Sequence, residues 1–215
     1  MLTRTARVAL NTFTNYVRFG IALAVFFLLT PYVIRKVGES DFGLWSFSWA
    51  VLNCFILLDL GYGTGVVKYV AEYKGSNDPE RRNRMLSTLA VVYAFLALLA
   101  AVLIYAFSLV FLRLFSIPSE QHSKAIALLW ILGARLAILG LPLGIFRGIL
   151  FGDQRILLVN AVQIAATLIY GLGSWLVLAF GYGLVALAWV NLAAMVAEHL
   201  AYLALSYLCL ERLRI

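Results

Sequence analysis

Residues 89–112 read LAVVYAFLALLAAVLIYAFSLVFL and contain no charged side chain. A helix needs about 20 consecutive apolar residues to cross the hydrocarbon core of a bilayer, and this stretch is long enough. It lacks the strict alternation of apolar and polar residues that marks a half-buried strand. Because lipid offers no partner for unpaired backbone groups, the stretch predicts a transmembrane helix.

The rest of the chain repeats this pattern. Its 215 residues are 64% hydrophobic and 13% charged, with a mean hydropathy of +0.95. A soluble domain is about 45–50% apolar and about 25% charged, so the excess of apolar side chains predicts contact with lipid. We expect an all-α integral membrane protein, a single bundle of about six helices over residues 1–215. The predicted spans are residues 10–34, 43–67, 85–112, 125–151, 156–179 and 184–210.

The net charge is +7, which in a soluble protein can indicate a nucleic-acid partner. Here the basic residues lie between the apolar runs and form no continuous face, so membrane lipids are the expected partners and nucleic acid is not. Apart from the mid-span Arg135, most of them fall on one side of the predicted topology. Only Arg35, Lys36, Arg113 and Lys124 fall on the other side. The positive-inside rule then predicts that both termini are cytoplasmic.

Charged side chains inside the predicted spans are costly in lipid and therefore prompt functional hypotheses. Arg18 and Asp59 fall at similar depths in the first two spans, which predicts either a structural ion pair or an Arg18 that borders an aqueous cavity. Arg135 and Glu198 fall near the bilayer middle in the fourth and sixth spans. An arginine at that depth needs a carboxylate partner or an anionic ligand. Arg18, Arg135 and Glu198 are therefore candidate cavity residues.

Polar residues form a stripe along the fifth predicted span. Asn160, Gln163, Thr167, Tyr170 and Ser174 follow one another at spacings of three and four, which places them on one helix face. Such a face either packs against other helices through hydrogen bonds or lines a water-filled path. Both interpretations remain open, and Asn160, Gln163 and Thr167 join the candidate cavity residues.

Small residues repeat in the fourth predicted span. Gly140, Gly144, Gly148 and Gly152 recur every four residues, a spacing that lets a neighbouring helix approach closely. Pro142 lacks a backbone N–H and predicts a kink. The span is either a packing element or a moving part of the molecule.

The sequence contains no Ser/His/Asp constellation, no metal-ligand spacing and no phosphate-binding loop. Glu198 and His199 alone are too few groups for catalysis. We therefore expect a protein that is not an enzyme, with no catalytic residues, no metal and no cofactor.

Two parts of the chain carry recognisable motifs. They are LTPYVIRKVG (29–38), FGLW (42–45), LDLGYG (58–63), VKYVAE (67–72) and GILFGDQR (148–155), followed by Asn160. With these motifs the chain resembles the polysaccharide-biosynthesis flippases, the Wzx-like translocases of the multidrug/oligosaccharidyl-lipid/polysaccharide exporter superfamily. The resemblance implies that the protein moves polyprenyl-diphosphate-linked oligosaccharide across the bacterial inner membrane during polysaccharide or O-antigen biosynthesis. It also implies two six-helix bundles around a cationic cavity, with alternating access.

The chain departs from that family in length, because family members have roughly twelve spans or more. The resemblance therefore implies either the amino-terminal half of a longer protein or a half-size protein that dimerises, so that a second six-helix bundle is an expected partner. Two alternatives stay open. One is an exporter of small cationic molecules, although its cavity should be acidic and here the mid-membrane charges include arginines. The other is a membrane scaffold or assembly subunit without transport of its own.

Overall fold

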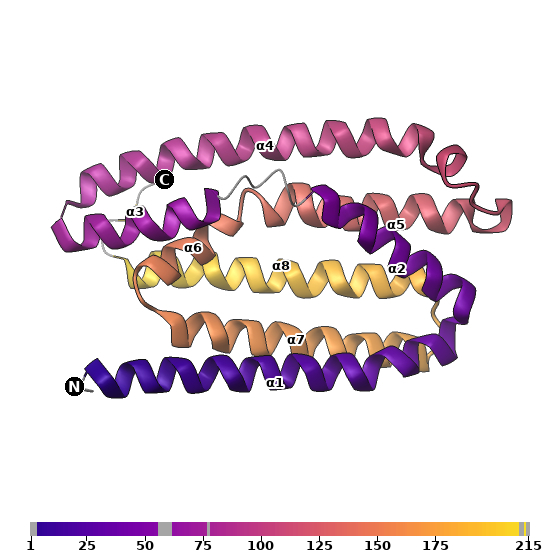
Figure 1. The fold of residues 1–215 in the computed structure, drawn as a ribbon, viewed down its shortest axis with the longest axis horizontal. Helices are drawn as coiled ribbons and strands as arrows, with labels where there is room; N and C mark the ends of the chain where they lie inside the picture. Colours follow the sequence, from indigo (N-terminus) through magenta and orange to yellow (C-terminus); the bar gives the residue numbers. More distant parts are fainter. Residues whose placement is uncertain (1–3, 56–61, 77, 211–212, 214–215) are drawn as a thin grey trace.

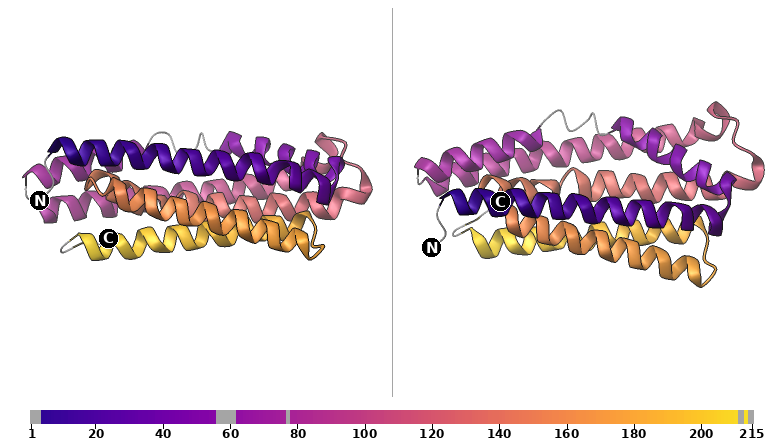
Figure 2. Two further views of the ribbon diagram at one scale, coloured as in Figure 1. Left: turned by 90° about the horizontal axis from the view of Figure 1, so that it is seen from below. Right: turned by 60° about the horizontal axis from the view of Figure 1, so that its bottom comes forward.

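The structure is a computed structural model that describes residues 4–55, 62–76, 78–210 and 213. All regular elements among these residues are helical, and the long helices run side by side along one axis (Figures 1 and 2). This confirms the predicted all-α class. The elements are α1 (Arg4–Val37), α2 (Glu39–Cys54), α3 (Tyr62–Ser76), α4 (Pro79–Leu114), η2 (Ser119–Gln121), α5 (His122–Ala134), η3 (Arg135–Gly140), α6 (Gly144–Gly152), α7 (Ile156–Ala179) and α8 (Leu184–Cys209).

The chain crosses the bundle back and forth. α1 begins and α8 ends at one end, where α3 also meets α4 and α6 meets α7 (Figure 1). We call this the terminal end. The opposite end, which we call the turn end, holds the connections from α1 to α2, from α4 to α5 and from α7 to α8. Successive crossings of the chain therefore run antiparallel, whereas α1 and α7, which lie side by side, run in the same direction (Figure 1).

Local sequence signals fix several of these connections. The Asp78 carboxylate caps α4 by accepting a hydrogen bond of 2.9 Å from the Arg81 backbone N–H, and Pro79 occupies the first helical turn, where its missing N–H costs nothing. At the turn end, Gly38 and Gly181 adopt φ angles of +86° and +81°. Side chains disfavour such angles, so glycine allows the sharp reversals there.

Among the described residues, five helical segments are long and apolar enough to cross a bilayer. Their outward faces expose large apolar side chains such as Phe13, Leu98 and Leu208. Water would penalise this surface and lipid does not, so the chain is a multi-pass membrane protein. The five segments are Val8–Val37, Pro79–Leu114, Ser119–Gly140, Ile156–Ala179 and Leu184–Cys209.

Two predicted spans contain more than one described helix. The second, predicted over 43–67, contributes to α2 and α3, and residues 56–61 lie outside the described part of the chain. The fourth, predicted over 125–151, is divided into α5, the π-helix η3 and α6. In η3 the Leu141 backbone N–H donates to the Leu136 carbonyl at 3.1 Å, a wider turn than an α-helix makes. The helix breaks between η3 and α6, at the segment that contains Pro142, whose ring cannot donate to the helix.

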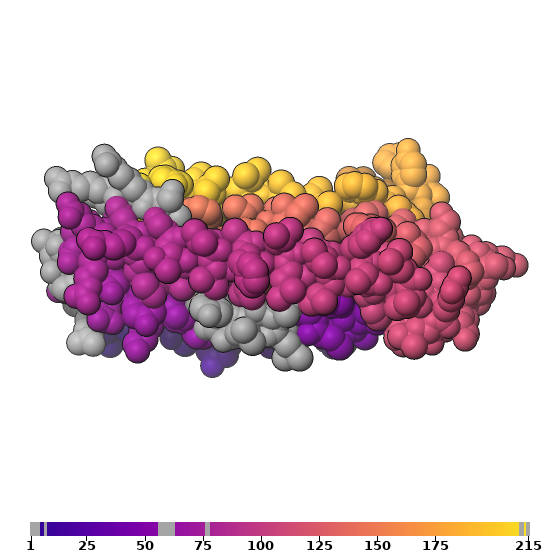
Figure 3. Space-filling view, turned by 90° about the horizontal axis from the view of Figure 1, so that it is seen from above, coloured from indigo at the N-terminus to yellow at the C-terminus, as the bar shows by residue number. Residues whose placement is uncertain are grey.

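Buried apolar residues form two clusters, one toward each end. The cluster at the terminal end includes Val70 and Tyr202, and the cluster at the turn end includes Leu128 and Leu187. α4 contributes to both clusters and runs along nearly the whole length of one face (Figure 3). Between the clusters, η3, α7 and α8 present polar side chains to the interior of the bundle.

Candidate functional site

Polar side chains from four elements line one cavity of about 210 Å³ between the two apolar clusters. We call this set the polar layer. It contains five of the sequence-predicted cavity residues and one that was not predicted. Its members are Arg18 of α1, Arg135 of η3, Gln163 and Thr167 of α7, and Asn191 and Glu198 of α8.

Arg135 begins the π-helix and reaches toward α2. Its guanidinium carbon lies 4.7 Å from the centroid of the Trp49 ring, close enough for a cation–π contact. Its Nε atom is buried and has no hydrogen-bond partner among the described residues. The contact with Trp49 therefore leaves this donor N–H unused.

Glu198 was the expected carboxylate partner of Arg135. Both residues line the cavity, but no ion pair within 4.0 Å joins them in the described part of the chain. The Glu198 carboxylate instead accepts a hydrogen bond of 2.9 Å from the Tyr202 hydroxyl. Arg135 therefore lacks direct neutralisation by the group that was predicted to supply it.

Arg18 brings a second guanidinium to the cavity from α1. Its Nε atom is also buried, without a hydrogen-bond partner among the residues that the structure describes. The predicted pairing with Asp59 stays a prediction, because Asp59 lies outside the described residues. Among the described residues, two arginines and one carboxylate line this cavity.

The polar stripe of α7 divides into two parts. Gln163 and Thr167 line the cavity, and the Gln163 side-chain oxygen is buried without a partner among the described residues. Asn160 is only 1% exposed and donates to the Thr14 hydroxyl of α1 at 3.0 Å. Both interpretations of the stripe thus have a place in the structure, with helix contact at Asn160 and cavity lining at the next two positions.

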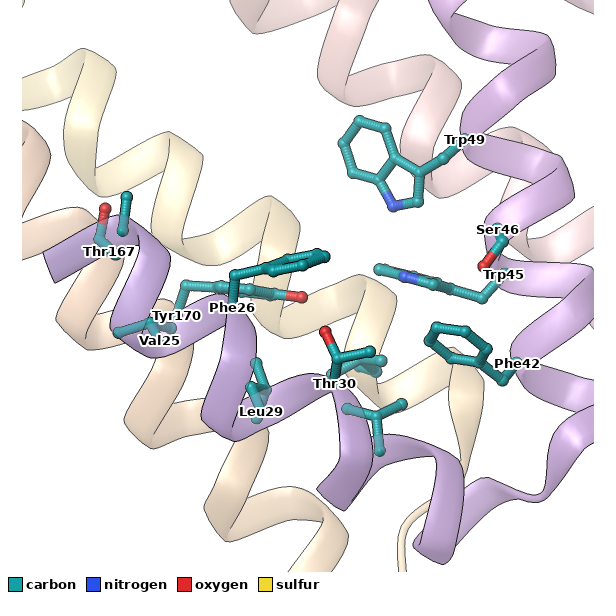
Figure 4. Close-up of a pocket in the computed structure, with 13 residues that line it drawn as sticks. Val25, Phe26, Leu29, Thr30, Phe42, Trp45, Ser46, Trp49, Thr167 and Tyr170 are labelled. Carbon is teal, nitrogen blue, oxygen red and sulfur yellow. The ribbon is translucent and has the colours of Figure 1, made fainter. Parts of the chain in front are cut away.

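The cavity continues in both directions along the bundle. A neighbouring cavity of about 460 Å³ shares Arg135, Gln163 and Glu198 with it and adds Arg147 toward the terminal end. A third, of about 430 Å³, shares Thr167 and Tyr170 and extends toward the turn end (Figure 4). The three cavities adjoin one another along the described bundle, a series that we call the path, and Arg18 and Arg135 line its middle member.

His199 lies at the edge of this path. It is 6% exposed, and its Nδ1 atom is 2.9 Å from the Met195 carbonyl oxygen. Its ring also packs against Tyr202, with 6.0 Å between the centroids. The histidine is thus held by its own helix.

The glycines predicted to mediate helix contact differ from one another. A Cβ on Gly148 would lie 2.8 Å from a Val66 methyl group, and one on Gly152 would lie 2.6 Å from Val70 Cβ. These two positions let α6 press against α3. Gly140 and Gly144 would accept a Cβ without such a clash, and both line the larger cavity.

A charged cluster joins three elements at the terminal end. Asp153, which follows α6, accepts 2.7 Å and 2.9 Å contacts from Lys74 Nζ and Arg155 Nε. The hydrogen bond to Asp153 raises the pKa of the Arg155 guanidinium above its ordinary value. The cluster ties α3 to the connection between α6 and α7.

Sequence reasoning missed three residues at this site. Asn191 lines the cavity with a buried, unpartnered side-chain oxygen among the described residues, and its position two helical turns before Glu198 on α8 was an available signal. Arg147 was interpreted only as a topology signal. Trp49 had no sequence signal, because its contact with Arg135 depends on how α2 crosses the bundle.

Comparison with known proteins gives one match. The family model described as "Polysaccharide biosynthesis protein" covers residues 7–214. No match was found among curated proteins or among solved structures. The match spans nearly the whole chain and agrees with the sequence resemblance and the helical bundle. The chain belongs to the polysaccharide biosynthesis protein family.

Proposed function

We propose that the protein translocates polyprenyl-diphosphate-linked oligosaccharide across the bacterial inner membrane, as one bundle of a flippase. Its family already gives it a role in polysaccharide biosynthesis, and its apolar helices make it a multi-pass membrane protein. The observation that carries the finer proposal is the pair Arg18 and Arg135. Both bring buried Nε atoms, unpartnered among the described residues, to one cavity.

The physical reason lies in the cost of buried charge. A guanidinium inside a bilayer is expensive unless it is paired, and a diphosphate supplies several negative oxygens that arginine can bind through two parallel N–H donors. Gln163, Thr167 and Asn191 add neutral hydrogen-bonding groups to the same cavity. Together these groups suit an anionic headgroup that must leave water while its lipid tail stays in the membrane.

The proposal includes a direction. Following the positive-inside rule, we place the terminal end in the cytoplasm and the turn end in the periplasm. The cargo would then enter from the cavity that Arg147 borders and leave past Thr167 and Tyr170. A second bundle, from another half or from a second copy, would complete the enclosure by alternating access. Of the predicted substrate-cavity residues, Arg18, Arg135, Gln163, Thr167 and Glu198 line the cavity and are the proposed substrate contacts, whereas Asn160 contacts Thr14 of α1.

The experiment compares Arg135→Ala, Arg135→Lys and Arg113→Ala. Arg113 is exposed at the turn end of α4 and serves as the matched loss of one arginine. Arg135→Ala should slow translocation of a fluorescent polyprenyl-diphosphate sugar in proteoliposomes by roughly 30-fold or more, because removing one partner of a buried charged pair costs about 2–5 kcal/mol. The translocation rate of Arg135→Lys should lie between those of Arg135→Ala and the unaltered protein, because lysine keeps the positive charge and lacks the planar guanidinium with its paired N–H donors.

The same variants are tested for surface polysaccharide in cells, at matched protein level. Arg113→Ala should behave as the unaltered protein in both assays. Normal translocation by Arg135→Ala would contradict the proposal. Surface polysaccharide that is lost without the protein but normal when Arg18 or Arg135 is substituted would instead support a scaffold or assembly subunit.

A further inference from the structure

The cavity toward the turn end differs in chemistry from the polar layer. Aromatic rings from two helices form its walls, with Phe26 on α1 and both Trp45 and Trp49 on α2 (Figure 4). Its volume of about 430 Å³ falls within the roughly 300–1,000 Å³ typical of small-molecule sites. We call it the aromatic cavity.

Hydroxyl groups interrupt these aromatic walls. Thr30, Ser46 and Tyr170 line the aromatic cavity together with the rings. In Figure 4 the hydroxyls of Thr30 and Tyr170 point into the space between α1 and α2. A wall that alternates flat rings with hydroxyls suits a ligand that has both C–H faces and O–H groups.

A sugar ring has this combination. One face of a pyranose carries mainly axial C–H bonds, whose positive hydrogens are attracted to the negative face of an aromatic ring. The edges of the same sugar carry hydroxyls that need hydrogen-bond partners once they leave water. An isoprenoid tail would use the rings and make no use of the wall hydroxyls.

The aromatic cavity is also continuous with the arginine site. Thr167 and Tyr170 line both cavities. Trp49 lines the aromatic cavity, and its ring centroid lies 4.7 Å from the guanidinium carbon of Arg135. A ligand with a phosphate at the arginines therefore has this cavity within reach of the next chemical group of its head.

We propose that the aromatic cavity is the subsite for the sugar attached to the diphosphate, with Phe26, Trp45 and Trp49 stacking on its apolar face and Thr30 bonding one of its hydroxyls. The inference rests on the proposed function, since it takes Arg18 and Arg135 as the diphosphate site. It assigns selection of the sugar to the turn-end half of the bundle, away from the charges.

The test uses a matched pair of neighbouring phenylalanines. Phe26 lines the aromatic cavity, and Phe27 does not, although their exposures are similar at 60% and 67%. The two rings contact each other at 5.7 Å, so Phe26→Ala and Phe27→Ala lose the same mutual contact. Since both side chains are largely exposed, neither truncation leaves a buried void. Thr30→Val adds a nearly isosteric removal of one wall hydroxyl.

Binding is measured by native mass spectrometry on the protein in lipid nanodiscs. The probes are bare undecaprenyl diphosphate and the same lipid carrying a single glucose, galactose or N-acetylglucosamine. At least one sugar should bind more tightly than the bare lipid. Phe26→Ala should weaken that sugar-bearing probe by about tenfold and Thr30→Val by about threefold. The affinity of both variants for the bare lipid should stay within about twofold of that of the unaltered protein. Phe27→Ala should change the affinity for every probe by no more than about twofold.

The outcomes separate this inference from the proposed function. If the unaltered protein binds bare and sugar-bearing lipids equally well, the sugar subsite is wrong while the diphosphate site stands. Equal losses for bare and sugar-bearing probes in Phe26→Ala would make the cavity a site for the isoprenoid and overturn the inference. If no diphosphate lipid binds, or if Arg135→Ala binds every probe normally, the proposed function itself fails.

Discussion

η3 and α6 lie one after the other in the chain and meet their neighbours in opposite ways. In α6, Gly148 and Gly152 remove the side chains that would separate it from α3. In η3, a widened helical turn presents Arg135 to a cavity. The first contact is dry and close, and the second is polar and open. The difference shows that one interrupted segment can pack against a neighbouring helix through α6 and line the cavity through η3.

The largest expected effect concerns the dry half. Gly152→Ala should lower the free energy of unfolding by about 1–3 kcal/mol, because overfilled interiors cost this much. Here the added Cβ would lie 2.8 Å from the Val67 carbonyl oxygen, and backbone cannot easily move aside. The measurement is thermal unfolding of purified protein in detergent.

Gly144→Ala is the control for that experiment. Nothing lies within 4 Å of a Cβ built on Gly144, and alanine favours the helix. This variant should match or slightly exceed the stability of the unaltered protein. Equal destabilisation by the two substitutions would remove the distinction between the dry and the open half.

A middle-sized effect concerns the contact between α7 and α1. Asn160 donates to Thr14 across this contact at 3.0 Å, and hydrogen bonds between membrane helices contribute about 0.6 to 1.7 kcal/mol. In a double-mutant cycle, Asn160→Ala and Thr14→Val should therefore show a coupling energy of about 1 kcal/mol. Additive losses would mean that Asn160 contributes to the cavity and not to this helix contact.

The smallest effect concerns the charged cluster at the terminal end. Lys74 is half exposed, with 52% of its side chain accessible, and ion pairs of this kind contribute about 0–1 kcal/mol. Asp153→Asn should therefore lower stability by less than about 1 kcal/mol, and added salt should shrink the difference. A loss as large as that of Gly152→Ala would show that charge, more than close helix contact, holds α3 to α6.

These expectations mark how far the sequence alone could lead. Long apolar runs predict the helices. The cap at Asp78 and Pro79 and the reversal at Gly181 are local features, because each acts through its own backbone. The structure divides the span predicted over 125–151 into three helical elements, and the span predicted over 43–67 includes residues 56–61, which lie outside the described part of the chain. Hydropathy averages over a window and does not register where the backbone hydrogen bonds of a helix are interrupted.

The site shows the same limit at the level of side chains. The predicted depths of Arg18, Arg135 and Glu198 were enough to nominate them as cavity residues, and the structure places all three in the lining of one cavity. The stacking of Arg135 on Trp49 and the hydrogen bond from Tyr202 to Glu198 depend on helix rotation and crossing. Helix rotation and crossing are set by contacts among all the helices, so one span's sequence cannot predict them.

The most direct test of the account measures whether the arginines of the polar layer touch a diphosphate. Protein with ¹⁵N-labelled arginine is reconstituted with undecaprenyl-diphosphate sugar, and solid-state NMR measures dipolar coupling between ³¹P and the guanidinium nitrogens. We predict coupling to the diphosphate phosphorus at hydrogen-bonding range, about 3–4 Å between nitrogen and phosphorus, reduced in Arg18→Lys and in Arg135→Lys. Coupling confined to phospholipid headgroups, unchanged in both variants, would contradict the claim that these buried arginines bind an anionic headgroup.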